Sequence, residues 1–221
     1  MKSRKISSDD RIVLLGSSRG LGWATYNQLI SQSSDSSYFL ASRKIKTREN
    51  EVSKNTVLAA QDFSKTPLDL SFLTQLKNFT PTRIIYFAGG GPHGVFEEKK
   101  WSDHQWAFNT SFLYPAELVH SILSDQSHWL GLRQIILIGS SVAENKADPL
   151  AASYAAAKHA LRGMVDSMAQ EASEKPIVQL FSPGYMQTDL LPAHSQPRQN
   201  GLAEDPVQVA KKLIAFIEKN D

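Results

Sequence analysis

Short apolar runs that alternate with longer amphipathic stretches constrain the fold of this chain more than any other feature. Six runs have the length and the Val, Ile and Leu content of buried strands: Ile12–Leu15, Tyr38–Ala41, Thr56–Ala60, Arg83–Phe87, Gln134–Ile138 and Ile177–Phe181. The stretches between them predict helices: one from Gly20 to about Gln32, Leu70–Lys77, one that carries Trp106, Phe108 and Phe112, Ala151–Ala172 and Pro206–Lys219. Because the strands are continuously apolar, both faces of the sheet are expected to be covered.

This order of strands and helices predicts a single α/β domain over residues 1–221, a Rossmann-like, doubly wound parallel sheet of six strands. A chain of 221 residues with 41% hydrophobic content is large enough to bury one substantial core. Ligands of such sheets bind at the carboxyl ends of the strands. The residues directly after each strand are therefore the first candidates for a site.

Composition excludes several classes of function. The formal net charge is +2 and the only basic cluster is Lys2, Arg4 and Lys5, so no nucleic-acid partner is expected. The chain has no cysteine, which excludes disulfides, thiol catalysis and cysteine-ligated metals, and we expect no metal site. No apolar run approaches the roughly 18–20 residues of a membrane-spanning helix. Ile12–Leu15 is too short for the core of a signal peptide, so we expect a soluble, cytoplasmic protein without a membrane partner.

A glycine-rich turn follows the first strand and opens the first helix. Its glycines allow a tight turn, and the amides of a helix N-terminus favour a pyrophosphate. A strand–helix loop whose glycines serve only packing is the alternative for such a turn taken alone. The candidate cofactor contacts are Gly16, Ser18, Arg19, Gly20, Leu21 and Gly22.

The residues after the second strand indicate which dinucleotide would bind. An acidic residue at this point would hold the ribose diol of NAD, but Ser42 and Arg43 stand there instead. Arginine donates paired hydrogen bonds to phosphate, and Arg19 could add a second cation. We therefore expect NADP(H), with NAD(H) as the less favoured cofactor. Solvated surface arginines are the alternative.

Tyr154 and Lys158 are separated by three alanines in the longest predicted helix. Residues four apart lie on one helix face, so the phenol and the ammonium are expected to point the same way. A nearby ammonium stabilises phenolate and lowers the pKa of a tyrosine, which would make Tyr154 a usable general acid or base near neutral pH. The same spacing is common by chance.

Together these segments resemble the short-chain dehydrogenase/reductase (SDR) family. The turn is similar to the family's T-G-x-x-x-G-x-G loop, with Leu15 in place of the Thr, and Tyr154 and Lys158 match its Y-x-x-x-K motif. Ser141, thirteen residues before Tyr154, matches the serine that binds the substrate oxygen; Ser140 is its competitor. The resemblance implies that Lys158 binds the nicotinamide ribose, and that Asn109 holds a water that completes a proton relay.

The resemblance also assigns cofactor contacts after the third, fourth and sixth strands. It places Asp62 on the adenine, although a helix cap before Ser64 and Lys65 is the alternative for this residue. Phe87, Ala88 and Gly89 align with the family's N-N-A-G motif, with Phe87 at the place of an Asn. The P-G-x-x-x-T stretch that closes over the nicotinamide is matched by Pro183, Gly184 and Thr188. Tyr154 and Lys158 are expected to touch the cofactor as well.

The implied activity is NADP(H)-dependent hydride transfer to a small carbonyl substrate, or from the corresponding alcohol, with Tyr154 as general acid/base. A non-catalytic, dinucleotide-sensing regulator is the first alternative, although all four catalytic positions are filled. Extended epimerases and dehydratases need a larger C-terminal substrate domain. A methyltransferase that uses S-adenosylmethionine would share the glycine-rich turn but would not need Tyr154 or Lys158.

Two departures from the family pattern bear on the substrate pocket and on assembly. No seventh strand follows the last predicted helix, and the region Leu190–Glu204, which forms a lid in the family, is short. His93 and His194 are expected on the polar rim of the pocket. The family pairs the helices after strands four and five across a two-fold axis, and here they carry Trp106, Phe108, Phe112, Tyr114, Leu161, Met164 and Met168. A C2 homodimer is therefore expected.

Overall fold

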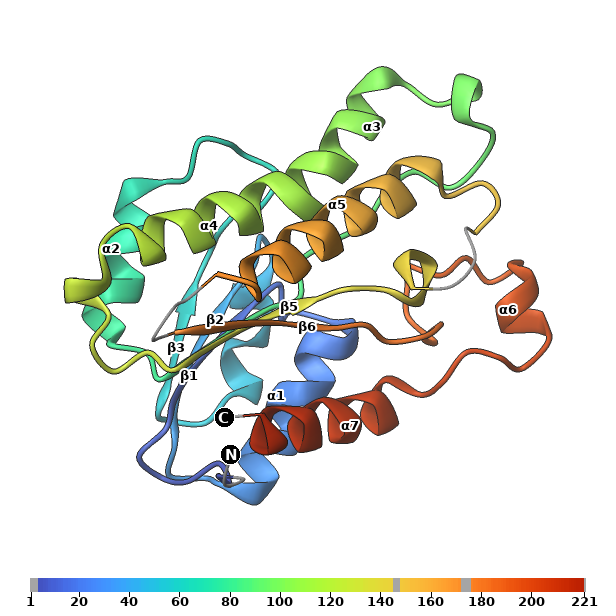
Figure 1. The fold of residues 1–221 in the computed structure, drawn as a ribbon. Helices are drawn as coiled ribbons and strands as arrows, with labels where there is room; N and C mark the ends of the chain where they lie inside the picture. Colours follow the sequence, from blue (N-terminus) through green and yellow to red (C-terminus); the bar gives the residue numbers. More distant parts are fainter. Residues whose placement is uncertain (1–3, 145–147, 172–175, 221) are drawn as a thin grey trace.

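A computed structural model of the chain describes residues 4–144, 148–171 and 176–220. Its centre is a parallel sheet of six strands in the order β3-β2-β1-β4-β5-β6 (Figure 1). The strands are β1 Arg11–Leu15, β2 Ser37–Ala41, β3 Thr56–Ala59, β4 Arg83–Tyr86, β5 Gln134–Ile138 and β6 Ile177–Phe181. The predicted six-stranded, doubly wound fold is confirmed.

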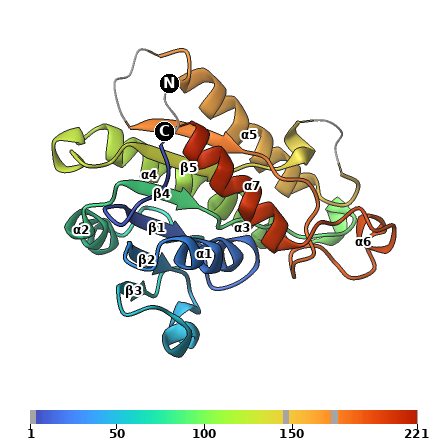
Figure 2. The same cartoon turned by 90° about the horizontal axis from the view of Figure 1, so that it is seen from below.

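Helices cover both faces of this sheet. They are α1 Gly20–Gln32, α2 Leu70–Phe79, α3 Trp101–Phe108, α4 Tyr114–Leu123, α5 Ala152–Met168, α6 Gln196–Gln199 and α7 Pro206–Lys219. Helices α1 and α7 lie on one face, whereas α2, α4 and α5 lie on the other (Figures 1 and 2). A π-helical turn, Asn109–Leu113, joins α3 to α4, and short 3₁₀ helices cover Ile45–Glu51, Phe96–Glu98, Gln126–His128 and Ser141–Ala143.

The strand sequence explains why two cores form. Successive side chains of a strand point to opposite faces. In β1, Val13 and Leu15 pack with α2, α4 and α5, whereas Ile12 and Leu14 pack with α1 and α7. All four side chains are fully buried. A run that is apolar at every position is therefore what this doubly covered sheet requires.

The predicted element boundaries are close to the observed ones. The last two strands and α7 match, while β3 and β4 each end one residue early. The long helix ends at Met168 rather than Ala172, and residues 172–175 lie outside the described part of the chain. The helix predicted around Trp106 is divided by the π-helical turn.

Several of the apolar residues behind the dimer prediction pack into the core of the protomer. Tyr114 and Leu161 are fully buried. Phe112, Met164 and Met168 are half-buried and pack against the same core. The sheet thus takes up part of this apolar surface, and the C2 homodimer stays a prediction. Leu113, at the end of the π-helical turn before α4, is a large apolar residue that is 43% exposed.

Candidate cofactor and catalytic site

The glycine-rich turn after β1 is built so that its glycines are necessary. Gly16 has a φ of +91°, and a Cβ there would lie 2.4 Å from the backbone nitrogen of Ala88. A Cβ on Gly22 would lie 2.9 Å from the carbonyl oxygen of Gly16. The turn therefore packs directly on itself and on the segment after β4, and only glycine permits this approach.

Leu15 stands where the family's loop has a Thr, and other side chains stabilise the turn here. The hydroxyl of Ser17, which is fully buried, donates to the carbonyl of Leu14 at 2.9 Å. Arg48 Nε donates to the carbonyl of Ser18 at 3.1 Å, and its guanidinium lies 4.6 Å from the centre of the Trp23 ring. Sequence reasoning missed Arg48, because nothing in the local pattern of Ile45–Glu51 links it to a turn thirty residues earlier.

Ser42, at the carboxyl end of β2, has an unfulfilled hydrogen-bonding group. Its side-chain oxygen is buried and has no partner among the described residues. Such a group is costly unless a ligand or a water completes it. This hydroxyl is where the sequence predicts a cofactor phosphate, so the residues present fit the predicted dinucleotide.

The two predicted phosphate arginines have different surroundings. Arg19 forms an exposed ion pair with Asp189, with 3.1 Å between Nη1 and Oδ2. Arg43 lies close enough to Asp62 for its charge to act on that carboxylate. Burial opposes ionisation of Asp62, but hydrogen bonds from Ser64 and the charge of Arg43 outweigh burial and lower its pKa. Arg43 thus faces the residue predicted to meet the adenine.

Asp62 organises the loop after β3. Its carboxylate accepts from the backbone amide of Ser64 at 3.0 Å and from the Ser64 hydroxyl at 2.7 Å. Asp69 caps α2, so the alternative of a helix cap does not hold for Asp62. The Asn109 amide donates to the carbonyl of Ser64 at 3.2 Å, so its side chain is turned toward this loop.

Three consecutive glycines after β4 bring the backbone against the catalytic candidates. A Cβ on Gly89 would lie 3.2 Å from Lys158 Nζ and 3.4 Å from the hydroxyl of Ser111. On Gly90 it would lie 2.6 Å from the Trp106 ring, and on Gly91 2.9 Å from Tyr154 Cβ. Side chains at these three positions would therefore enter space that the neighbouring residues already fill.

The predicted pair on α5 is brought to this segment. Lys158 is 3% exposed, and its ammonium donates to the carbonyl of Ile138 at 2.6 Å. Burial lowers the pKa of Lys158 to about 8. Its Nζ lies 5.6 Å from the centre of the Tyr154 ring. Both residues share one helix face, as their spacing predicts.

The pKa of Tyr154 differs from the expectation. Burial raises it, and a hydrogen bond with Ser140 only partly opposes that effect. The predicted lowering was therefore wrong for this arrangement, because desolvation of the phenolate is the larger effect. A raised pKa keeps the phenol protonated, which is the form that a proton donor needs.

The two serines after β5 have different partners. Ser140 lies close enough to Tyr154 to lower the pKa of the phenol, and its oxygen accepts from Val142 N at 3.4 Å. The backbone amide of Ser141 donates to the carbonyl of Pro183 at 2.9 Å, which ties this turn to the segment after β6. Spacing favours Ser141, whereas the effect of Ser140 on the pKa of Tyr154 favours Ser140. The choice of Ser141 stays a prediction.

The segment after β6 reaches over the glycine-rich turn. Thr188 Cγ2 lies 3.4 Å from the point that a Cβ of Gly20 would occupy, whereas nothing lies within 4 Å of that point at Gly184. The rings of His93 and His194 meet edge to face, with centres 6.2 Å apart. The segment Leu190–Glu204 thus approaches the loop after β4 at these two histidines.

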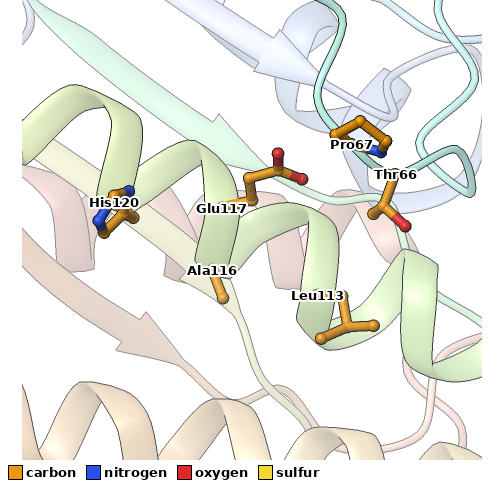
Figure 3. Close-up of a pocket in the computed structure, with 6 residues that line it drawn as sticks. All are labelled: Thr66, Pro67, Leu113, Ala116, Glu117 and His120. Atoms are coloured by element: carbon orange, nitrogen blue, oxygen red, sulfur yellow. The ribbon is translucent and has the colours of Figure 1, made fainter.

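A separate hollow of about 590 Å³ lies on the outer face of α4 (Figure 3). It is open and largely apolar, and it contains none of the predicted site residues. Its lining is Thr66, Pro67, Leu113, Ala116, Glu117 and His120.

No helix among the described residues is both long enough and apolar enough to cross a membrane. Residues 4–144, 148–171 and 176–220 contain no group of three or more His, Asp or Glu side chains placed to hold a metal ion.

Solved structures of similar fold cover nearly the whole chain. A 4-hydroxyisoleucine dehydrogenase solved with NADH and succinate has a TM-score of 0.79 at 20% identity, over 93% of this chain and 91% of that one. BdcA, solved with NADPH, has a TM-score of 0.74 at 19% identity, over 96% and 88%. An alcohol dehydrogenase from the archaeon Thermococcus sibiricus, solved with 5-hydroxy-NADP, has a TM-score of 0.70 at 19% identity, over 95% and 92%.

Sequence comparison gives the family directly. No curated protein matches the chain significantly. The family model described as short chain dehydrogenase, however, matches residues 10–199, which includes every predicted site residue. The six-stranded parallel sheet and the motifs at its carboxyl edge agree with that match. The chain belongs to the short-chain dehydrogenase family of oxidoreductases.

Proposed function

We propose that this protein is an NADP(H)-dependent reductase of a small carbonyl compound. The observation that carries the proposal is that Lys158 and Tyr154 both lie against the glycine run after β4, with Ser140 near the phenol of Tyr154. A buried ammonium, a protonated phenol and a backbone without side chains form a surface suited to a flat cofactor and a substrate oxygen. Three structures of similar fold carry NADH, NADPH or 5-hydroxy-NADP, which supports a nicotinamide dinucleotide here.

In this proposal the carboxyl edge of the sheet holds the cofactor along its length. The turn Gly16–Gly22 binds the pyrophosphate, and Ser42 and Arg43 bind the 2′-phosphate. Asp62 contacts the adenine. Phe87, Ala88 and Gly89, together with Pro183, Gly184 and Thr188, would hold the nicotinamide half. When bound, the nicotinamide exchanges a hydride with the carbon that bears the substrate oxygen.

The protein's own groups would then manage the proton. Tyr154 donates its phenolic proton to the substrate oxygen as negative charge develops there, and Ser141 or Ser140 donates a hydrogen bond to the same oxygen. Lys158 supplies positive charge beside the phenol and binds the ribose. Asn109 would bring the water that returns a proton to the site. Oxidation of the corresponding alcohol is the reverse of these steps.

Loss of NADPH absorbance with a panel of small carbonyl compounds tests this function. Tyr154→Phe should lower kcat on the order of 10²–10⁴-fold while NADPH still binds, because it removes the proton and little else. Ser140→Ala and Ser141→Ala decide which hydroxyl binds the substrate oxygen. The variant that removes this hydroxyl should lose about 10²–10³-fold in kcat, and the other should not. Near-wild-type turnover by Tyr154→Phe would reject the mechanism. NADPH binding without turnover of any substrate would favour the dinucleotide-sensing regulator.

We also propose that the protein acts in the cytoplasm as a C2 homodimer that pairs through α4 and α5. The support for pairing is the exposed Leu113 beside the apolar hollow on α4 (Figure 3). A second copy would remove this surface from water. Light scattering at micromolar concentration should give about twice the 24.5 kDa mass of the chain, whereas a monomer mass would reject the dimer.

A further inference from the structure

Ser111 makes an unusual pair of contacts beside the catalytic lysine. Its side chain is fully buried, and its oxygen accepts from the backbone amide of Gly90 and donates to the carbonyl of Gly90, both at 3.1 Å. One hydroxyl thus satisfies both backbone groups of a single residue. The same oxygen lies 3.4 Å from the point where a Cβ of Gly89 would stand, and Lys158 Nζ lies 3.2 Å from that point.

The π-helical turn determines which residue of this helix meets the glycine run. Within Asn109–Leu113 the backbone amide of Tyr114 bonds to the carbonyl of Asn109, five residues back. Such a turn carries one more residue than an α-helical turn, and so it rotates the later residues of the helix by about 100°. The Thr110 carbonyl at this turn accepts from the hydroxyl of Tyr86 at 2.8 Å. This hydrogen bond from a residue of β4 therefore stabilises the π-helical turn.

Asn109 and Ser111 consequently serve different parts of the site. The Asn109 amide donates to the carbonyl of Ser64, in the loop after β3. The hydroxyl of Ser111 instead holds Gly90, on the lysine side. Positions two apart on a helix face in nearly opposite directions, so one helix supports two loops at once.

We propose that Ser111 is a positioning residue for the reaction: it clamps Gly90 and thereby sets the Gly89 backbone against Lys158. The clamp rests on the proposed function, since it matters to catalysis only if a nicotinamide lies on this backbone. The atoms nearest to the position of a Gly90 Cβ are carbons of the Trp106 ring and of Leu190, so this side of the turn is apolar. Without the hydroxyl, the amide and carbonyl of Gly90 lose their buried partner and the turn shifts to regain one.

The first test is Ser111→Ala in the full chain. We expect kcat to fall by about 10²-fold, the order of loss that misplacement by about 1 Å causes, and the pH profile of kcat to shift because Lys158 gains a different neighbour. Hydrogen exchange at the Gly90 amide should be faster in the cofactor-free protein, because its acceptor is gone. Asn109→Ala should leave exchange at the Gly90 amide unchanged, because the Asn109 amide donates to the carbonyl of Ser64 and not to Gly90.

Two variants separate positioning from general loss of stability. Ser36 is also fully buried, and its hydroxyl donates to the carbonyl of Ser7 at 2.8 Å, at the amino end of β2. Ser36→Ala should lower the melting temperature without changing kcat, its pH profile or Gly90 exchange. Ser111→Cys keeps a weak donor and acceptor of similar size, so it should recover part of kcat; it also replaces Ser111→Ala if that variant does not fold.

The outcomes distinguish this inference from the function on which it rests. A Ser111→Ala or Ser111→Cys protein with wild-type kcat, pH profile and Gly90 exchange would overturn the clamp and leave the reductase intact. A wild type that does not bind NADPH would overturn the reductase and, with it, the catalytic role of Ser111. In that case Gly90 exchange in the cofactor-free variants would still show whether the contact itself exists.

Discussion

Gly16→Ala tests whether the glycine-rich turn is built as the structure indicates. The new Cβ would lie 2.4 Å from the nitrogen, 2.7 Å from Cα and 2.9 Å from Cβ of Ala88, closer than atoms normally pack. Ala88 is held in turn, because its amide donates to the carbonyl of Leu15 at 3.2 Å. The clash therefore cannot be relieved by rotating a flexible side chain.

Two costs add in this variant. A non-glycine residue at a φ of +91° costs roughly 1–2 kcal/mol, and overpacking a tight site costs about 1–3 kcal/mol more. The free energy of unfolding should fall by about 2–5 kcal/mol. At about 2–4 °C per kcal/mol for a chain of this size, the melting temperature should fall by roughly 4–20 °C. NADPH affinity should fall as well, because the amides that would face the pyrophosphate move.

Gly163→Ala is the matched control for the same added methyl. Gly163 lies in α5, and nothing stands within 4 Å of the position of its Cβ. Alanine is the better helix former, so this variant should gain about 0.5–1 kcal/mol and keep its NADPH affinity. Circular dichroism melts and NADPH titration measure both proteins. If Gly16→Ala melts within a degree of wild type and binds NADPH equally well, the turn is not packed as described.

Three further predictions address the cofactor, the lysine and assembly. Arg43→Asp should move the ratio of kcat/KM from NADPH toward NADH, since a diol partner replaces a phosphate partner; a wild type that prefers NADH would contradict the assignment. The pKa of Lys158 is lowered from 10.5 to about 8, so between these values the unfolded chain binds more protons and stability rises with pH. Urea unfolding of wild type should show a gain of about 3 kcal/mol from pH 8 to 10.5 relative to Lys158→Met, and parallel curves would refute the burial of that charge. Leu113→Asp should halve the mass measured by light scattering, whereas Leu130→Asp, at a site that is 91% exposed, should not; equal masses for both would place the interface elsewhere.

The sequence was sufficient for the architecture because its information is periodic and local. Apolar runs of four or five residues between amphipathic stretches allow few arrangements other than a covered parallel sheet. The turn Gly16–Gly22 and the pair Tyr154 and Lys158 are likewise local patterns, readable from spacing alone. Their order along the chain, each group after its own strand, is enough to indicate the family.

Only the tertiary structure decided which side chains meet at the site. Arg48 supports Ser18 from thirty residues away, and Ser111 holds Gly90 from twenty-one residues away. Spacing favoured Ser141, but it is Ser140 whose side chain acts on the pKa of Tyr154. A π-helical turn changes the face that each later residue presents, and periodicity of 3.6 cannot reveal it.

The physical reason for this division is the range of the interactions. Burial of apolar side chains is non-directional and tolerates small shifts, so a pattern of residue types is enough to specify strands and layers. A hydrogen bond depends on distances of about 3 Å and on angle, so it is fixed only after the whole chain has packed. The fold of this protein could therefore be predicted from its sequence, whereas the contacts that position Lys158 and the glycine run could be identified only from the tertiary structure.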